Sequence, residues 1–175
     1  MIRKFLLTIL AIFALWVGGL GYYLYLINSY KLNSNTTNAI IVFAGGGHKI
    51  ETGIALLKAG YAPILFITGI ESTEQLKNLL KERNVIEQQV ILAPNKIMSE
   101  EDNIKKAVDF IVTYNLTSII LVEHNYNMPF MLNKLEKAIP SSNNIYIVPY
   151  PVFFSKQKYD VLLKSYHRYL ISIVN

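Results

Sequence analysis

The sequence predicts a Rossmann-like α/β fold, a three-layer sandwich with a mainly parallel sheet of about five strands, preceded by one transmembrane helix. Three observations lead to this fold class. An uncharged apolar segment stands near the N-terminus, short runs rich in β-branched residues follow it, and stretches of helical period separate those runs. Strands that are apolar on both faces and alternate with helices are typical of a parallel sheet covered on both sides. We therefore expect a cytoplasmic N-terminus (residues 1–4), a transmembrane helix (5–27), a linker (28–38) and the α/β domain (39–175).

The apolar segment contains no charged residue from position 5 to position 27. About 20 apolar residues in a helix cross a hydrocarbon core of ~30 Å. Arg3 and Lys4 precede the segment, so the positive-inside rule places the N-terminus in the cytoplasm and the domain on the periplasmic side of the inner membrane. A cleaved signal peptide needs a shorter apolar region that ends in small residues. Bulky residues stand there instead, which favours an uncleaved signal anchor with an aromatic belt of Tyr22, Tyr23, Tyr25 and Tyr30.

The elements of the domain follow from its periodicity. Five apolar runs are the expected strands: residues 39–44, 64–68, 90–92, 118–122 and 145–148. Between them, apolar residues recur with the period of a helix. We expect Gly60 to end the first of these helices in a left-handed conformation, and Ser99 with Asp102 to form a capping box at the start of the third. A last helix carries one apolar stripe: Tyr159, Leu162, Leu163, Tyr166, Leu170 and Ile173.

Charge and composition exclude several classes of protein. The formal net charge is +5, but Arg3, Lys4 and Lys31 belong to the N-terminal segment, and residues 32–175 hold 14 basic against 12 acidic residues. A nucleic-acid-binding protein needs a basic patch or stripe, so no nucleic acid is expected as a partner. The absence of cysteine excludes disulfides, thiolate zinc sites and a cysteine nucleophile. No metal site is expected, since the histidines are scattered along the chain: His48, His124 and His167.

The candidate site is predicted by topology, because open parallel sheets bind ligands beyond the carboxyl ends of their strands. The glycine triplet Gly45, Gly46 and Gly47 follows the first strand and precedes a helix. Its backbone amides and the helix dipole can hold an anion, with Lys49 adding positive charge. The alternative is a tight turn without a ligand. A dinucleotide fingerprint is not complete, because Ile50 occupies the position of its last glycine.

Polar residues at the other strand ends are candidates with structural alternatives. Asp102 and Asn103 open the third helix, where they can orient a ligand or a water molecule, although capping alone explains them. Glu123 and His124 end the fourth strand and are plausible acid and base partners. Adjacent strand residues point to opposite faces, however. Asn127 is expected at or beside the N-cap of the next helix.

A set of fragments in fixed order carries a resemblance to a known family. In chain order they are Gly45-Gly46, residues 49–63 (KIETGIALLKAGYAP), Thr68-Gly69, Glu100 with Asp102 and Asn103, residues 125–130 (NYNMPF), and residues 149–151 (PYP). With this spacing, residues 38–155 resemble the YdcF/SanA/ElyC-like family, bacterial envelope-associated domains of unknown function. This chain differs from the family pattern at one motif, where Asn127 replaces the family's histidine and Phe130 replaces its arginine. Asparagine does not titrate near neutral pH, and phenylalanine cannot clamp a phosphate.

The resemblance implies a membrane-anchored protein of cell-envelope or peptidoglycan-precursor homeostasis, with the lipid bilayer as partner and a lipid-linked phosphate as ligand. The residues that would bind the ligand are Gly45, Gly46, Gly47, Lys49, Thr68, Gly69 and Asn103. One alternative is a catalytically degenerate binding or scaffold module, which the changes at Asn127 and Phe130 favour. A second is a nucleotide or S-adenosylmethionine binder, in which Glu71 is a loose candidate for contact with a ribose.

Overall fold

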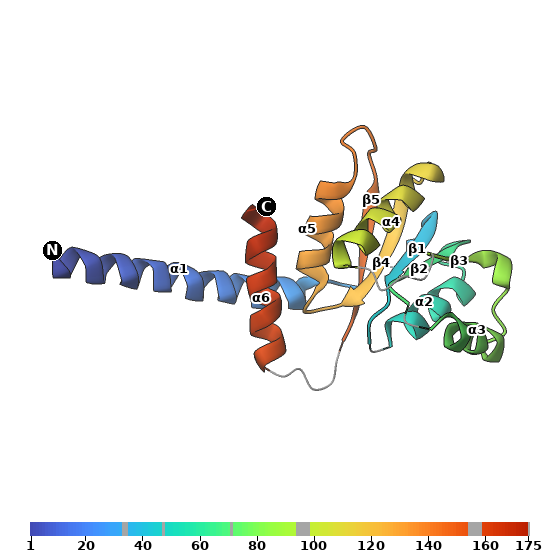
Figure 1. Ribbon diagram of the computed structural model, residues 1–175, viewed down its shortest axis with the longest axis horizontal. Coiled ribbons are helices and arrows are strands. Elements are labelled where there is room, and N and C mark those ends of the chain that lie inside the picture. Colours follow the sequence, from blue (N-terminus) through green and yellow to red (C-terminus); the bar gives the residue numbers. More distant parts are fainter. Residues whose placement is uncertain (33–34, 47, 71, 94–98, 154–158, 175) are drawn as a thin grey trace.

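The structure is a computed structural model that describes residues 1–32, 35–46, 48–70, 72–93, 99–153 and 159–174. Its first helix, α1 (Ile2–Ser29), projects from the α/β domain with the N-terminus at its far end (Figure 1). The helix is long and apolar enough to cross a membrane, with a mean hydropathy of 2.1 in its most apolar stretch, none of which is buried. α1 extends the predicted segment at both ends.

The domain contains five parallel strands, which confirms the predicted fold class. They are β1 (Ala39–Phe43), β2 (Leu65–Thr68), β3 (Val90–Leu92), β4 (Ser118–His124) and β5 (Tyr146–Val152), in the order β3-β2-β1-β4-β5. β4 runs two residues further than expected and ends on Glu123 and His124. β5 is also longer than predicted and includes Pro149 and Pro151. Proline cannot donate to a ladder, but β5 is an edge strand paired only with β4, where proline is tolerated.

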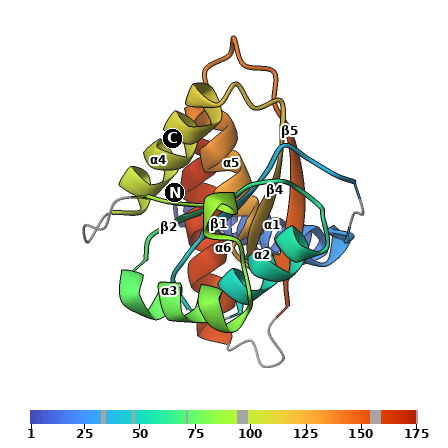
Figure 2. The same ribbon diagram turned by 90° about the vertical axis from the view of Figure 1, so that its right-hand side faces the viewer.

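Helices cover both faces of the sheet (Figure 2). They are α2 (Lys49–Lys58), α3 (Thr73–Glu82), α4 (Glu100–Thr113), α5 (Met128–Ala138) and α6 (Tyr159–Val174), with a short 3₁₀ turn at Glu87–Gln89. Residues of α2 and α3 pack on one face, and those of α4 and α5 on the other. Two predicted helix ends are confirmed: Gly60 has φ +78° after α2, and Ser99 with Asp102 forms a reciprocal capping box on α4.

The core lies on both faces of the central strand β1. Ile41 packs with residues of α4 and α5, whereas Ile40 and Val42 pack with α2 and α3. All three side chains are fully buried, and burial of such a side chain stabilises a fold by about 1.5–3 kcal/mol. Gly53 lets α2 approach the sheet, because a Cβ at this position would stand 2.6 Å from Val42 Cγ2.

α6 packs outside α5 and joins the domain to α1. It lies across α1 in Figures 1 and 2. The crossing buries Tyr23, Ile27 and Tyr166, and the Tyr166 hydroxyl donates to the Trp16 carbonyl over 2.8 Å. Gly19 lies directly beneath the Tyr166 hydroxyl, which occupies the space that a Cβ at position 19 would need. Tyr23, predicted as part of an interfacial aromatic belt, is instead buried against the domain, because α6 covers its face of α1.

Candidate functional site

The central strands β1 and β4 lie side by side, and the chain leaves them in opposite directions, towards β2 and towards β5. This is the topological switch point at which such sheets bind ligands. A cavity of about 360 Å³ opens there, beyond the carboxyl ends of both strands. Its walls come from β1, β4, the first turns of α2, α4 and α5, and α6: Phe43, Ala44, Gly45, Lys49, Glu100, Asn103, Glu123, His124, Tyr126, Asn127, Met131 and Arg168.

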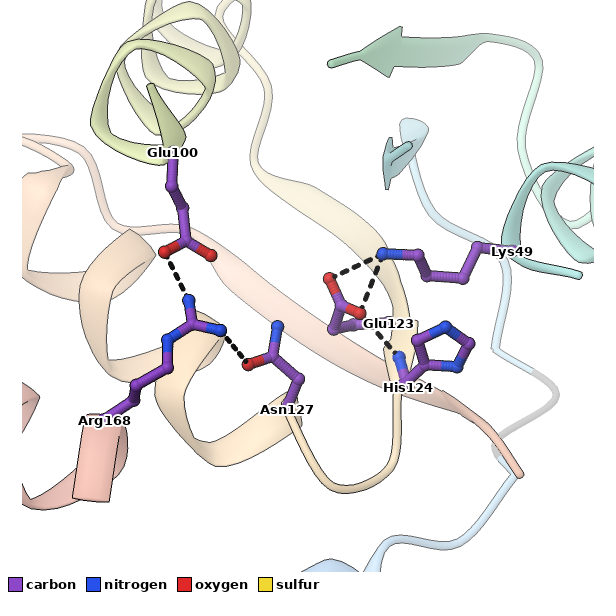
Figure 3. A network of polar contacts seen from close by, with 6 residues as sticks. All are labelled: Lys49, Glu100, Glu123, His124, Asn127 and Arg168. Atoms are coloured by element: carbon purple, nitrogen blue, oxygen red, sulfur yellow. Dashed lines mark hydrogen bonds and ion pairs between the residues drawn. The ribbon is translucent and has the colours of Figure 1, made fainter. Parts of the chain in front are cut away.

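A buried ion pair forms one wall of the cavity (Figure 3). Lys49 Nζ lies 2.9 Å from Glu123 Oε1 and 3.2 Å from Oε2, and the two side chains are 6% and 2% exposed. Glu123 Oε1 also accepts a hydrogen bond from the His124 backbone N–H at 2.8 Å. We expected Lys49 to offer its charge to an anion. That charge is instead matched by Glu123, because the end of β4 brings the carboxylate to the first turn of α2.

Arg168 of α6 supplies a second cation, which the sequence did not indicate as a site residue (Figure 3). Its guanidinium forms an ion pair with Glu100 on α4, donates to Asn127 Oδ1 over 3.3 Å and lies 4.2 Å from the centre of the Phe130 ring. An arginine thus reaches the beginning of α5 from another helix and lies over the Phe130 ring. The only available signal was its place on the terminal helix, whose apolar stripe dominated the sequence pattern.

Asn103 connects α4 to the end of β2. The Thr68 hydroxyl donates to Asn103 Oδ1 over 2.7 Å. Gly69 has φ +74°, and a Cβ there would lie 3.3 Å from Asn103 Nδ2. Asn103 lines the cavity, whereas the fully buried Thr68 does not. Thr68 and Gly69 therefore position Asn103 rather than form the cavity wall.

His124 and Tyr126 form the wall beside Glu123. Their rings stack with centroids 5.1 Å apart. Burial lowers the pKa of His124, and the charge of Lys49 lowers it further, although Glu123 and backbone hydrogen bonds oppose them. The imidazole is therefore neutral near neutral pH and can exchange a proton with a bound group. Glu123 and His124 line one cavity despite their adjacent positions, because the cavity surrounds the end of β4 rather than one face of it.

The remaining predicted residues are divided between this cavity and its surroundings. Gly45 (φ +119°) and Gly46 (φ +80°) form the expected turn in a conformation that favours glycine. Gly45 lines the cavity, but Gly46 and Gly69 belong to a second cavity of about 420 Å³ that Gly45 also borders. Two sequence candidates lie outside the described residues: Gly47 and Glu71.

Asp102 has the capping role considered for it, and Asn127 stands at the expected N-cap without making a capping hydrogen bond. The exposed Asp102 carboxylate accepts hydrogen bonds from the Ser99 N–H (3.1 Å) and hydroxyl (2.8 Å). These bonds lower the pKa of Asp102, and the residue is not among those that line the cavity, so its position supports capping and not ligand contact. Asn127 is the N-cap of α5, but its side chain makes no capping hydrogen bond and contacts Arg168 instead. Among the described residues, no group of three or more His, Asp or Glu side chains is placed to hold a metal ion.

Comparison with known proteins identifies relatives of the whole chain. No protein-family model matches it. The chain is 94% identical over 174 residues to "Uncharacterized protein RC1356" of Rickettsia conorii, covering 99% of each chain. It is 87% identical over 175 residues to "Uncharacterized protein RP875" of Rickettsia prowazekii, covering 100% of each. The protein therefore belongs to the family of these two uncharacterised rickettsial proteins.

Proposed function

We propose that this chain is a membrane-anchored, YdcF-like protein of the cell envelope that binds the phosphorylated head group of a lipid-linked ligand in the cavity at the ends of β1 and β4. α1 is the anchor. Arg3 and Lys4 favour an N-terminus in the cytoplasm and a domain on the periplasmic side of the inner membrane. Such a ligand is a precursor of peptidoglycan or of another envelope polymer.

The observation that carries this proposal is that one helix, α6, both packs on the anchor and lines the cavity. α6 packs Tyr166 against α1 and, two residues later, places Arg168 in the cavity wall. A second connection joins the same parts, because the Tyr23 hydroxyl of α1 donates to the carbonyl of Tyr126, another wall residue. A ligand held in the bilayer by its lipid tail is suited to a cavity that is built directly onto the anchor.

The charges of the cavity favour a phosphate at Arg168. Its ion pair with Glu100 is about two-fifths exposed on both sides, and such exposed pairs contribute only ~0–1 kcal/mol. A phosphate offers the planar guanidinium a bidentate partner of higher charge and can replace Glu100. The buried pair of Lys49 and Glu123 is not exchangeable in this way, because separating it leaves an uncompensated buried charge.

The test is a thermal melt of the full-length protein in detergent with a polyprenyl phosphate, followed by the fluorescence of Trp16, the single tryptophan, which contacts α6. A ligand at ~100 times its dissociation constant adds about 2.7 kcal/mol, which corresponds to a rise of roughly 5–10 °C for a chain of this size. The parent polyprenol, which lacks the phosphate, is expected to give no rise. Arg168→Gln should abolish the rise.

The matched control is Arg83→Gln, the same change at an exposed residue that does not line the cavity; this variant should keep the full rise. An equal rise with polyprenol, or a full rise in Arg168→Gln, would contradict the proposal. A rise with an adenine nucleotide or S-adenosylmethionine alone would support the nucleotide alternative. No rise with any of these compounds in a folded protein would favour the scaffold alternative.

A further inference from the structure

We infer that α6 is an interfacial helix, which lies in the surface of the bilayer beside α1 and inserts its outer apolar side chains among the lipids. The inference rests on the part of the proposed function that makes α1 a membrane span. It goes further by adding a second element that contacts the membrane and by giving the depth of the domain relative to the bilayer surface.

The first argument is the crossing of the two helices. α6 stands between α5 and the projecting N-terminal part of α1, and it lies across α1 (Figures 1 and 2). A helix that crosses a membrane span in this way lies in the plane of the membrane. The crossing is held by the Tyr166 hydroxyl on the Trp16 carbonyl and by the Tyr166 ring against Tyr23, with centroids 5.5 Å apart.

The second argument is the length of α1 that remains beyond α6. Tyr166 crosses at Gly19, and the apolar segment begins at Phe5, so 14 steps of ~1.5 Å separate them, about 21 Å. A hydrocarbon core is ~30 Å thick, so about 9 Å of it is left when Phe5 lies at the far boundary. With Phe5 at that boundary, α1 spans an undeformed core only when α6 enters the bilayer surface. This depth agrees with the ~5–10 Å to which interfacial helices bury their apolar face.

The third argument is the composition of the exposed surface of α6. Its exposed apolar side chains are Tyr159 (87% exposed), Leu163 (39%), Ile171 (56%), Ile173 (50%) and Val174 (86%), and all but Ile173 recur at helical spacing. The opposite side is fixed to the domain, because Ser165 and Ser172 are buried and Lys137 Nζ of α5 donates to the Ser172 carbonyl over 2.6 Å. The exposed Asp160, Lys164 and His167 interrupt the apolar surface, which suits a helix at the boundary between head groups and acyl chains rather than one at the centre of the hydrocarbon.

The consequence concerns access to the cavity. Arg168 leaves the same helix towards the cavity, so the cavity lies within about one helix diameter, ~10–12 Å, of the lipid surface. A phosphate on an embedded lipid can reach the guanidinium while its tail stays in the bilayer.

The test uses the native absence of cysteine, which allows a single label at each chosen position. Full-length Leu163→Cys and Ile171→Cys are labelled with a small fluorophore and reconstituted in phosphatidylethanolamine–phosphatidylglycerol vesicles with spin-labelled lipid as quencher. Both replaced side chains are exposed, so the fold should tolerate the changes. Leu10→Cys in α1 is the reference for lipid, and Lys81→Cys on α3 is the reference for water.

We expect quenching at both α6 positions several-fold above that of Lys81→Cys and approaching that of Leu10→Cys. Quenching at Leu10→Cys, with both α6 positions equal to Lys81→Cys, would overturn the interfacial helix and leave the anchor and the proposed ligand untouched. Absence of quenching at Leu10→Cys as well would overturn the membrane span and the interfacial helix together.

Discussion

The buried pair of Lys49 and Glu123 allows a quantitative test of what holds the cavity together. Lys49→Met removes the ammonium group and keeps a side chain of similar length. The Glu123 side chain, 2% exposed, then keeps the His124 backbone N–H as its one hydrogen-bond donor among the described residues, in place of a full positive charge. Removing one partner of a buried pair costs ~3–5 kcal/mol, because the remaining charge stays desolvated. At ~2–4 °C per kcal/mol, the melting temperature should fall by roughly 10 °C.

The measurement is urea unfolding of the full-length protein in detergent at neutral pH, followed by circular dichroism. Lys81→Met, at an exposed position on α3, is the matched control and should change the free energy of unfolding by less than ~0.5 kcal/mol. The double variant Lys49→Met with Glu123→Leu should recover most of the loss, since both buried charges are then absent. Two results would refute the reasoning. One is a Lys49→Met variant as stable as Lys81→Met. The other is a double variant that loses the sum of the two single effects, which would show that the charges are not coupled.

Three further predictions concern other parts of the chain. Gly19→Ala should weaken the docking of α6 on α1 by about 1–3 kcal/mol, because the new Cβ meets the Tyr166 hydroxyl. Gly18→Ala, with open space around it, is the control, and the fluorescence of Trp16 is the readout. Equal effects of the two substitutions would argue against the crossing of α1 and α6. The pKa of His124 is lower in the folded protein than in the unfolded chain, so the unfolded chain binds the proton more readily. The free energy of unfolding is therefore unaffected by this residue above pH ~6.5 and decreases as the pH falls below that value. The free energy of unfolding should therefore fall less between pH ~7.5 and ~5.5 in His124→Gln than in the wild type, and identical pH profiles would disprove this. Ser99→Ala removes the capping box of α4 and should cost ~1 kcal/mol in urea unfolding, whereas no loss would mean that the box contributes nothing.

Much of the fold could be predicted from local pattern. The five apolar runs became five parallel strands in the predicted chain order, Gly60 has the left-handed conformation expected after α2, and the capping box of α4 is present. Strand lengths were less accurate at the edge, where β5 continues through Pro149 and Pro151. Proline argues against a strand in general, but the rule depends on whether the strand has one neighbour or two, and the sequence does not state this.

The place of the candidate site was also predictable, because the switch-point rule follows from strand order alone. Its charge pattern was not. The sequence predicts Lys49 as the partner of an anion and gives no indication of Arg168. Sequence separation explains both: Lys49 and Glu123 are 74 positions apart, and Arg168 and Glu100 are 68 apart. No local periodicity records which charged side chains meet across such distances.

The sequence by itself thus determined the apolar N-terminal helix, the alternation of strands and helices, and the strand ends at which the cavity forms. Each of these depends on hydrophobic period and turn chemistry, which act over a few neighbouring residues. Only the tertiary structure decided that Glu123 neutralises Lys49, that Arg168 enters the cavity and that α6 packs across α1 at Gly19. These contacts arise when distant elements pack together, and packing geometry selects the partner of each side chain.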